Sequence, residues 1–408
     1  MRILLTHHFP LDGADSGLAT YDLAQGLVRS GHLVRLLVLD LGGSEDVVDV
    51  YDTLTVRRVV CRPGKAADLP FELPGFSAAP GDQPTFSGLS TGQLAAYREV
   101  LRRELDREVD AFNPHLIHAQ HVWVQAQLAL ESGVPYVVRA WGPELEGEQS
   151  EVRYHALAEQ AADNASRIFV ASAALGKRVR RAYERCAERI VVVPPAVDER
   201  RLAMPPKRGE LLARWGVHDP AAKVVVVAGP LVLDSGFDLL LNAAARYAQT
   251  HPRAMTLIAG VGPQRTELES QAERLGLESV RFLGQLNRDA LTALYQSASV
   301  AVQPAAEAAS WVGAASALAA GAPVIAIAGS GLEELVTNAT GELVAAADHE
   351  LLAETIGRAL DENWRHVKGP AGQRLIAEKF SLDVVVARHV EHYTALLGER
   401  FGDSAADE

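Results

Sequence analysis

The chain has 408 residues, with 52 acidic and 39 basic side chains and a formal net charge of −13. A single hydrophobic core rarely extends beyond about 250–300 residues, so this length predicts two domains. The negative charge and the lack of a Lys/Arg run argue against a nucleic-acid surface, which leaves small molecules as the expected partners. Cys61 and Cys186 lack the spacing of a zinc site, which favours buried thiols in a reducing compartment.

No segment holds the ~20 apolar residues of a membrane span, and the first residues lack an apolar stretch of signal-peptide length. We therefore expect a cytoplasmic protein, with peripheral contact at a membrane left open.

The first half of the chain alternates apolar runs with helical patterns. Residues 2–6 predict a strand, and a loop containing Gly13 and Gly17 then leads to a helix over 18–30. Further strands are predicted at 33–39, 55–60, 116–119, 136–139, 167–171 and 190–193, and helices at 93–111, 122–132 and 151–165. The long stretch from Pro63 to Gly92 predicts a lid or an acceptor loop. Alternatively, its aromatic residues cover the core; they are Phe71, Phe76 and Phe86.

The same alternation resumes after a predicted hinge at residues 205–209. Strands are predicted at 223–228, 255–259, 280–283, 300–302 and 323–327, and helices from 237 and at 264–275, 288–297, 312–320 and 384–398. This pattern predicts an α/β fold with two doubly wound parallel sheets, whose ligands bind at the carboxyl ends of the strands. The predicted domains are 1–200 and 201–383, followed by a helix and acidic tail at 384–408 that can pack back on the first domain.

The loop before the first helix has two interpretations. Backbone N–H groups near Gly17 can attract an anion, or this glycine merely permits close helix packing. The Gly-x-Gly-x-x-Gly fingerprint is absent, so dinucleotide binding has little support.

Short motifs along nearly the whole chain resemble, in their order and spacing, those of the retaining glycosyltransferase family four. Among them are Pro-His-Leu-Ile-His-Ala at 114–119, Ala-Gly-Val-Gly-Pro at 259–263, Arg-Phe-Leu-Gly at 281–284, Ala-Gly-Ala-Pro-Val at 320–324 and Gly-Leu-Glu-Glu-Leu-Val at 331–336.

The resemblance implies the GT-B fold, in which two Rossmann-like domains face each other across a ligand cleft. It implies retaining, metal-independent transfer of a sugar from a UDP-, GDP- or ADP-type nucleotide sugar, with no other cofactor. The second domain would hold this donor, and the first would meet a small-molecule or lipid-linked acceptor.

The sequence departs from the family at the donor diphosphate. The family usually carries an Arg after the first strand of the second domain and a Lys before the next helix. Here these positions are Pro230 and Ser235, and Asp234 adds a negative charge. Losing one preorganised donor typically costs about a hundredfold or more in rate. The candidate substitutes are the Ser235 hydroxyl, the helix that starts near Gly236, Arg139 and Arg265.

Two further departures concern carboxylates and the donor sugar. The second glutamate of the acidic motif becomes Ser316, and Glu307 replaces the first only if one residue is inserted; otherwise it is a solvated carboxylate. Trp141 stands where the family commonly has a His, and either stacks on a sugar or fills the core. Glu334 matches its family position near the donor ribose.

Three sets of candidate residues follow. Glu307 and Trp141 are the catalytic candidates, and the acceptor side is expected at His8, Trp141 and Glu144. The donor-binding candidates are Gly17, Gly229, Ser235, Gly236, Gly262, Glu307, Ser316 and Glu334. No metal is expected, and His118 and His121 read as structural residues beside a buried strand.

Three functions follow as hypotheses. The first is an active glycosyltransferase with an atypical donor site. The second is a catalytically inactive relative that binds or scaffolds a companion glycosyltransferase. The third is other chemistry in the same fold, such as an epimerase or a phosphorylase.

Overall fold

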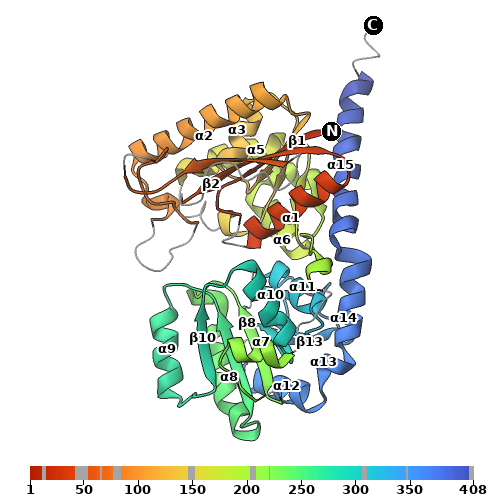
Figure 1. The fold of residues 1–408 in the computed structure, drawn as a ribbon. Helices are drawn as coiled ribbons and strands as arrows, with labels where there is room; N and C mark the ends of the chain where they lie inside the picture. The colour runs from red at the N-terminus through yellow and green to blue at the C-terminus, as the bar shows by residue number, and fades with distance from the viewer. Residues whose placement is uncertain are drawn as a thin grey trace. The chain divides into compact units, whose positions relative to one another are not determined.

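The structure is a computed structural model that describes residues 1–11, 15–41, 54–64, 67–76, 84–145, 152–202, 208–219, 221–305, 310–345 and 348–403. The chain divides into two compact units, shown in Figure 1. Unit 1 contains Met1–Ala196 and Leu382–Glu408, and unit 2 contains Val197–Ser381. Glu307 lies outside the described residues, as do Gly13, residues 77–83 of the predicted lid and residues 205–207 of the predicted hinge.

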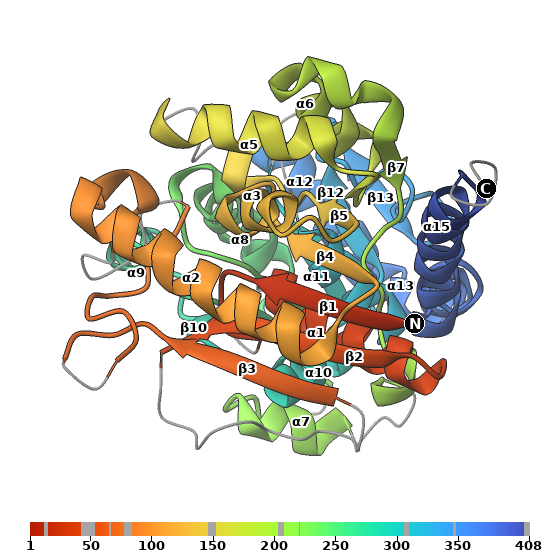
Figure 2. The same cartoon turned by 90° about the horizontal axis from the view of Figure 1, so that it is seen from above.

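The described part of unit 1 holds a seven-stranded parallel sheet in the order β3-β2-β1-β4-β5-β6-β7. Figure 2 shows β3, β2, β1 and β4 side by side in this order. The strands are β1 Arg2–His7, β2 Leu33–Asp40, β3 Leu54–Val60, β4 Leu116–Gln120, β5 Tyr136–Arg139, β6 Ile168–Val170 and β7 Ile190–Val192. Their apolar runs are long because helices cover both faces of a parallel sheet.

One face of this sheet packs on α2, α3, α5 and α6, and the other packs on α1 and the C-terminal helix α15. The bounds are α1 Asp15–Arg29, α2 Thr91–Phe112, α3 Val124–Glu131, α5 Val152–Asn164, α6 Ala173–Ala182 and α15 Leu382–Asp403. Helix α15 is fixed by the His118 ring, whose Nδ1 lies 2.6 Å from the Tyr393 hydroxyl oxygen.

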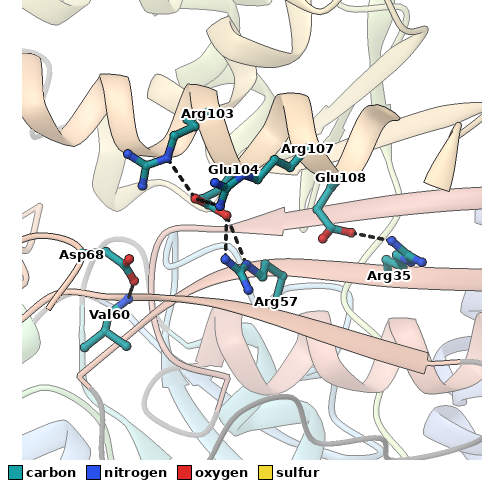
Figure 3. Close-up of polar contacts among 8 residues, drawn as sticks. All are labelled: Arg35, Arg57, Val60, Asp68, Arg103, Glu104, Arg107 and Glu108. Atoms are coloured by element: carbon teal, nitrogen blue, oxygen red, sulfur yellow. Dashed lines mark hydrogen bonds and ion pairs between the residues drawn. The ribbon is translucent and has the colours of Figure 1, made fainter. Parts of the chain in front are cut away.

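Helix α2 is tied to the sheet by a buried carboxylate. Glu104 is 2% exposed and bonds Arg57 of β3, as well as Arg103 and Arg107 of its own helix (Figure 3). The helix begins with a capping box, in which Ser90 and Gln93 bond each other's backbone N–H. The Arg57–Glu104 ion pair links α2 to the edge strand β3, while Arg103 and Arg107 add two more cations around the same carboxylate.

The described part of unit 2 holds a six-stranded parallel sheet in the order β10-β9-β8-β11-β12-β13. Its strands are β8 Lys223–Ala228, β9 Ala254–Ala259, β10 Val280–Gly284, β11 Val300–Gln303, β12 Val324–Ile327 and β13 Gly341–Val344. Its helices are α7 Arg208–Arg214, α8 Phe237–Thr250, α9 Arg265–Arg274, α10 Arg288–Ser297, α11 Trp311–Ala319, α12 His349–Asp361, α13 Trp364–Val367 and α14 Gly369–Leu375.

The predicted doubly wound α/β architecture is confirmed in both units, two local predictions need correction, and one open alternative is decided. Arg208 and Gly209 begin helix α7 instead of extending a hinge. Gly17 lies in the first turn of α1, not in the loop before it, because the helix starts at Asp15. Of the aromatic residues in the predicted lid, Phe86 is fully buried in the unit 1 core, while Phe71 and Phe76 pack against it.

Candidate functional site

Each sheet reverses its strand order at one point, between β1 and β4 in unit 1 and between β8 and β11 in unit 2. Ligands of doubly wound sheets bind at the carboxyl ends of the strands near such a reversal. The candidate residues are therefore expected at these two edges.

At the edge of unit 1, Glu144 forms a buried carboxylate–imidazole pair with His121. Its carboxylate accepts hydrogen bonds from Trp141 N at 2.8 Å and Gly142 N at 2.9 Å, and its Oε2 lies 3.3 Å from His121 Nδ1. Burial alone would raise the pKa of the Glu144 carboxyl, but the attraction to His121 and these hydrogen bonds outweigh it and lower the pKa. Glu144 is therefore held ionised.

His121 is the residue that sequence reasoning set aside and the structure brings into the site. It follows β4 directly and has a φ of +69°, a left-handed conformation that is uncommon outside glycine. With Nδ1 on Glu144, its buried Nε2 has no partner among the described residues. Its position one residue beyond a strand's carboxyl end, like that of His8, was the signal in the sequence.

The predicted acceptor-side residue His8 is enclosed in the interior. Its Nδ1 lies 2.6 Å from the Tyr97 hydroxyl oxygen, and its Nε2 accepts a hydrogen bond from Gln125 N at 3.3 Å. Burial and the neighbouring His121 and His7 hold the pKa of His8 well below its usual value. Both ring nitrogens are thus engaged within the fold.

Trp141 is half-buried at the end of β5, and its indole Nε1 donates to Gln120 Oε1 at 3.1 Å. The Arg139 guanidinium lies 5.6 Å from the centre of its ring. Arg139, which the sequence suggested as a mobile substitute for the diphosphate cation, is instead 2% exposed and donates from Nη2 to His389 at 2.9 Å. Burial fixes it in unit 1.

At the edge of unit 2, the two glycine-containing loops after β8 and β9 run side by side. Gly229 N bonds Ala259 O, and Leu231 N bonds Val261 O, each at 3.0 Å. A Cβ atom at Gly260, whose φ is +144°, would lie 1.9 Å from Gly229 O, and one at Gly262 would lie 2.1 Å from Leu231 O. Only glycine permits this backbone approach.

The loop leading into α8 is equally dependent on its backbone. Gly236 has a φ of +72°, and a Cβ there would lie 2.2 Å from Pro304 O. The Ser235 hydroxyl donates to Val232 O at 2.6 Å, so its proton is used in a hydrogen bond within the loop. Residues 229–236 contain no basic side chain.

The remaining donor-side candidates are spread over unit 2. Ser316 is half-buried on α11, and Glu334 is exposed in the turns between β12 and β13. Arg265 on α9 forms an ion pair with Glu269 at 2.8 Å. Gly17, the donor-side candidate in unit 1, has a packing role, because a Cβ there would lie 2.4 Å from Pro10 O.

Within the described ranges, no group of three or more His, Cys, Asp or Glu side chains is arranged to hold a metal ion. The same ranges contain no helix long and apolar enough to cross a membrane.

Two family models match adjoining parts of the chain. Residues 17–201 match glycosyltransferase family 4, and residues 216–374 match glycosyl transferases group 1. Among solved structures, a sucrose-phosphate synthase from Thermosynechococcus elongatus has a TM-score of 0.77 at 19% identity, covering 98% of this chain and 100% of that one. The Anabaena protein HepE, solved with UDP and glucose, has a TM-score of 0.72 at 21% identity, covering 97% and 100%. The fold is therefore of the GT-B type.

Curated relatives agree with these matches. A D-inositol 3-phosphate glycosyltransferase of Mycobacteroides abscessus is 29% identical over 329 residues, covering 74% of this chain and 68% of that protein. A 2-deoxystreptamine glucosyltransferase of Streptomyces kanamyceticus is 30% identical over 117 residues, covering 28% and 30%. The first part of the chain thus matches glycosyltransferase family 4 and the second part glycosyl transferases group 1, so the chain is of the glycosyltransferase type.

Proposed function

We propose that this protein transfers a sugar from a nucleoside diphosphate sugar to a hydroxyl group of an acceptor, with retention of configuration and without a metal ion. The observation that carries the proposal is the pair of glycine-lined loops after β8 and β9, in the unit matched by the group 1 model. These two loops pack directly on each other at the sheet edge where a nucleotide is proposed to bind, and a side chain at Gly260 or Gly262 would force them apart.

The leaving diphosphate must be stabilised as its charge grows. The family resemblance places a cation pair there, but this chain has Pro230 and Ser235, and the Ser235 hydroxyl is bonded to Val232 O. The N-terminal turn of α8 is the remaining group of donors, since its cap residue Gly236 supplies no side-chain hydrogen bond. A helix start leaves its first N–H groups available, and its dipole favours an anion.

Glu334 is proposed to bind the donor ribose or sugar. Its exposure in the turns after β12 leaves its carboxylate accessible, and its neighbour Glu333 has a different role, since Glu333 Oε1 accepts a hydrogen bond from Gly329 N at 2.8 Å.

The names of the relatives suggest the first substrates to test. The Anabaena protein was solved with UDP and with UDP-glucose, so UDP sugars come before GDP and ADP sugars. The curated relatives are named for inositol 3-phosphate and 2-deoxystreptamine, which favours a small cyclic acceptor with several hydroxyl groups over a lipid-linked one.

The test is a thermal-shift titration with UDP, GDP, ADP and their sugars, followed by measurement of nucleotide release. A ligand at a hundred times its dissociation constant should add about 2.7 kcal/mol of stability. We expect Glu334→Ala to weaken donor binding by about tenfold. Glu278→Ala, which removes an exposed carboxylate of the same unit, should leave it unchanged. Absence of both stabilisation and turnover with every donor would refute the proposal, and equal affinity in the Glu334 and Glu278 variants would refute the role of Glu334.

A second candidate is an inactive relative that acts as a binding partner of a companion glycosyltransferase. It is favoured by the occupied Ser235 hydroxyl and by the lack of a basic side chain at 229–236. It predicts nucleotide binding without turnover, together with recovery of an active glycosyltransferase when the tagged protein is isolated from its native cells.

A further inference from the structure

A small pocket lies in unit 1, where the carboxyl ends of β4 and β5 meet helices α1 and α15. Its apolar side is formed by residues of these two helices and of the segment after β7, among them Leu23, Ala196 and Val385. Its polar side carries Gln120, Arg139 and His389, with Trp141 beside them. The pocket is small, and part of it is open to solvent.

Arg139 brings an uncompensated positive charge to this pocket. It is 2% exposed, and no carboxylate forms an ion pair with it among the described residues. Burial lowers the pKa of Arg139 to about 10, which leaves the guanidinium charged at neutral pH. Its Nη1 is buried without a hydrogen-bond partner in the described part of the chain. A buried cation in this state is costly unless an anion accompanies it.

Among the described residues, the group bonded to the Arg139 guanidinium is His389, which cannot supply that anion. His389 Nδ1 lies 2.8 Å from Val385 O, which requires a proton on Nδ1 and leaves Nε2 as the acceptor for Arg139. Burial, and then the charge of Arg139, lowers the pKa of His389 to about 3. The His389 ring is therefore neutral, and both of its nitrogens already form hydrogen bonds.

Gln120 supplies a second buried donor that, like Arg139 Nη1, has no hydrogen-bond partner among the described residues. The indole Nε1 of Trp141 can only donate, so the amide oxygen of Gln120 must face it, and the amide nitrogen faces away. That Nε2 atom is buried and also lacks a partner in the described residues. Both unfilled atoms are donors, so the pocket is suited to a ligand with acceptor oxygens.

We propose that this pocket is an anion subsite that binds a carboxylate or phosphate group carried by the acceptor, through Arg139 Nη1 and Gln120 Nε2. The oxygens of such a group match two adjacent N–H donors, and its charge neutralises the guanidinium. The identity of the carrier rests on the proposed transferase function, whereas the anion subsite itself does not.

The first test measures anion binding without turnover. Inorganic phosphate and acetate are titrated into the full chain by calorimetry at constant ionic strength. We expect binding to the wild type, a loss of affinity of about tenfold or more in Arg139→Gln, and wild-type affinity in Arg98→Gln, a matched variant at a surface arginine of unit 1. A wild type that binds neither anion, or an Arg139→Gln variant that binds as the wild type does, overturns the subsite.

A second variant keeps the test decisive if Arg139→Gln folds poorly. Gln120→Glu places a carboxylate next to the guanidinium, so it should raise the melting temperature and abolish binding of phosphate and acetate while Arg139 stays in place. Unaltered phosphate affinity in Gln120→Glu would place the anion elsewhere and contradict the proposal.

The third arm separates an acceptor's anionic group from free phosphate. Glucose 6-phosphate and glucose are compared with inorganic phosphate for binding to the wild type and Arg139→Gln. The proposal expects the phosphorylated sugar to bind more tightly than either fragment and to lose that advantage in Arg139→Gln. If inorganic phosphate alone binds through Arg139, the acceptor assignment is wrong while the anion subsite stands; absent turnover with any donor would count against the transferase alone.

Discussion

The carboxyl edges of the two sheets are built from different parts of the chain. In unit 1 the edge is filled with buried polar side chains, including the His121–Glu144 pair and Arg139 with its partner His389. In unit 2 the edge is formed by backbone, because Gly260 and Gly262 let one loop lie against the next. Loop residues such as Pro230 and Val261 are exposed there.

Because of this difference, one architecture supports two kinds of ligand recognition, one by buried side chains and one by backbone. Buried side chains in unit 1 have fixed orientations and charges, so they suit a ligand with matching polar groups. Closely packed backbone in unit 2 fixes the start of α8, whose cap residue Gly236 supplies no side-chain hydrogen bond, and such a helix start suits a phosphate-bearing ligand. Three perturbations test the contrast, in order of decreasing expected effect.

The largest effect is expected from Gly260→Ala in unit 2. The new Cβ would lie 1.9 Å from Gly229 O at a φ of +144°, so the backbone must shift, and we expect a loss of about 2–4 kcal/mol in the free energy of unfolding. Chemical denaturation measures it. Gly276→Ala is the matched control, because Gly276 also has a positive φ of +65° but open space around its Cβ position. Equal losses in both variants would mean that close approach of the two loops is unimportant.

An intermediate effect, counted per histidine and per pH unit, is expected from acid, and it should fall on unit 1. Burial lowers the pKa of His7 to about 3, whereas an unfolded histidine has a pKa of about 6.5. Between these values the unfolded chain binds the extra proton, so stability is full above pH 6.5 and falls as the pH drops toward 3. His8, His118 and His389 act in the same direction, and their pKa values are also lowered by burial.

His7→Phe should therefore reduce the pH slope of stability by about 1.4 kcal/mol per pH unit within this window. Denaturation at several pH values measures the slope, and hydrogen exchange assigns the loss to unit 1. His366→Phe, at an exposed position of unit 2, serves as the control. If unit 2 opened first as the pH falls, the contrast between the units would fail.

The smallest effect is expected from Ser235→Ala. The Ser235 hydroxyl already donates its proton to Val232 O. We therefore expect a loss of about 0.5–1.5 kcal/mol in the free energy of unfolding and little change in nucleotide affinity. Ser270→Ala, which removes a similar hydroxyl bond to Thr266 O on α9, is the control for stability. A large drop in UDP affinity in Ser235→Ala alone would show that this side chain, and not only backbone, contacts the donor.

The alternation of strands and helices can be predicted from the amino-acid sequence alone, because buried parallel strands require near-continuous apolar runs such as Lys-Val-Val-Val-Val-Ala in β8. The sequence also exposed the departures at Pro230 and Ser235, since these are differences of residue type at fixed motif spacing. It missed β13, Gly-Glu-Leu-Val, because four residues with one charge carry too little pattern.

The pairing of the polar groups could be seen only in the folded structure. His121 meets Glu144 across 23 positions of sequence, and Arg139 meets His389 across 250, distances at which no local pattern operates. The role proposed for Arg139 thus depends on a helix near the end of the chain, whose histidine is neutral and whose packing leaves the guanidinium without a carboxylate among the described residues. Burial leaves the Arg139 side chain with a donor that has no partner among the described residues, and burial is a property of the folded molecule.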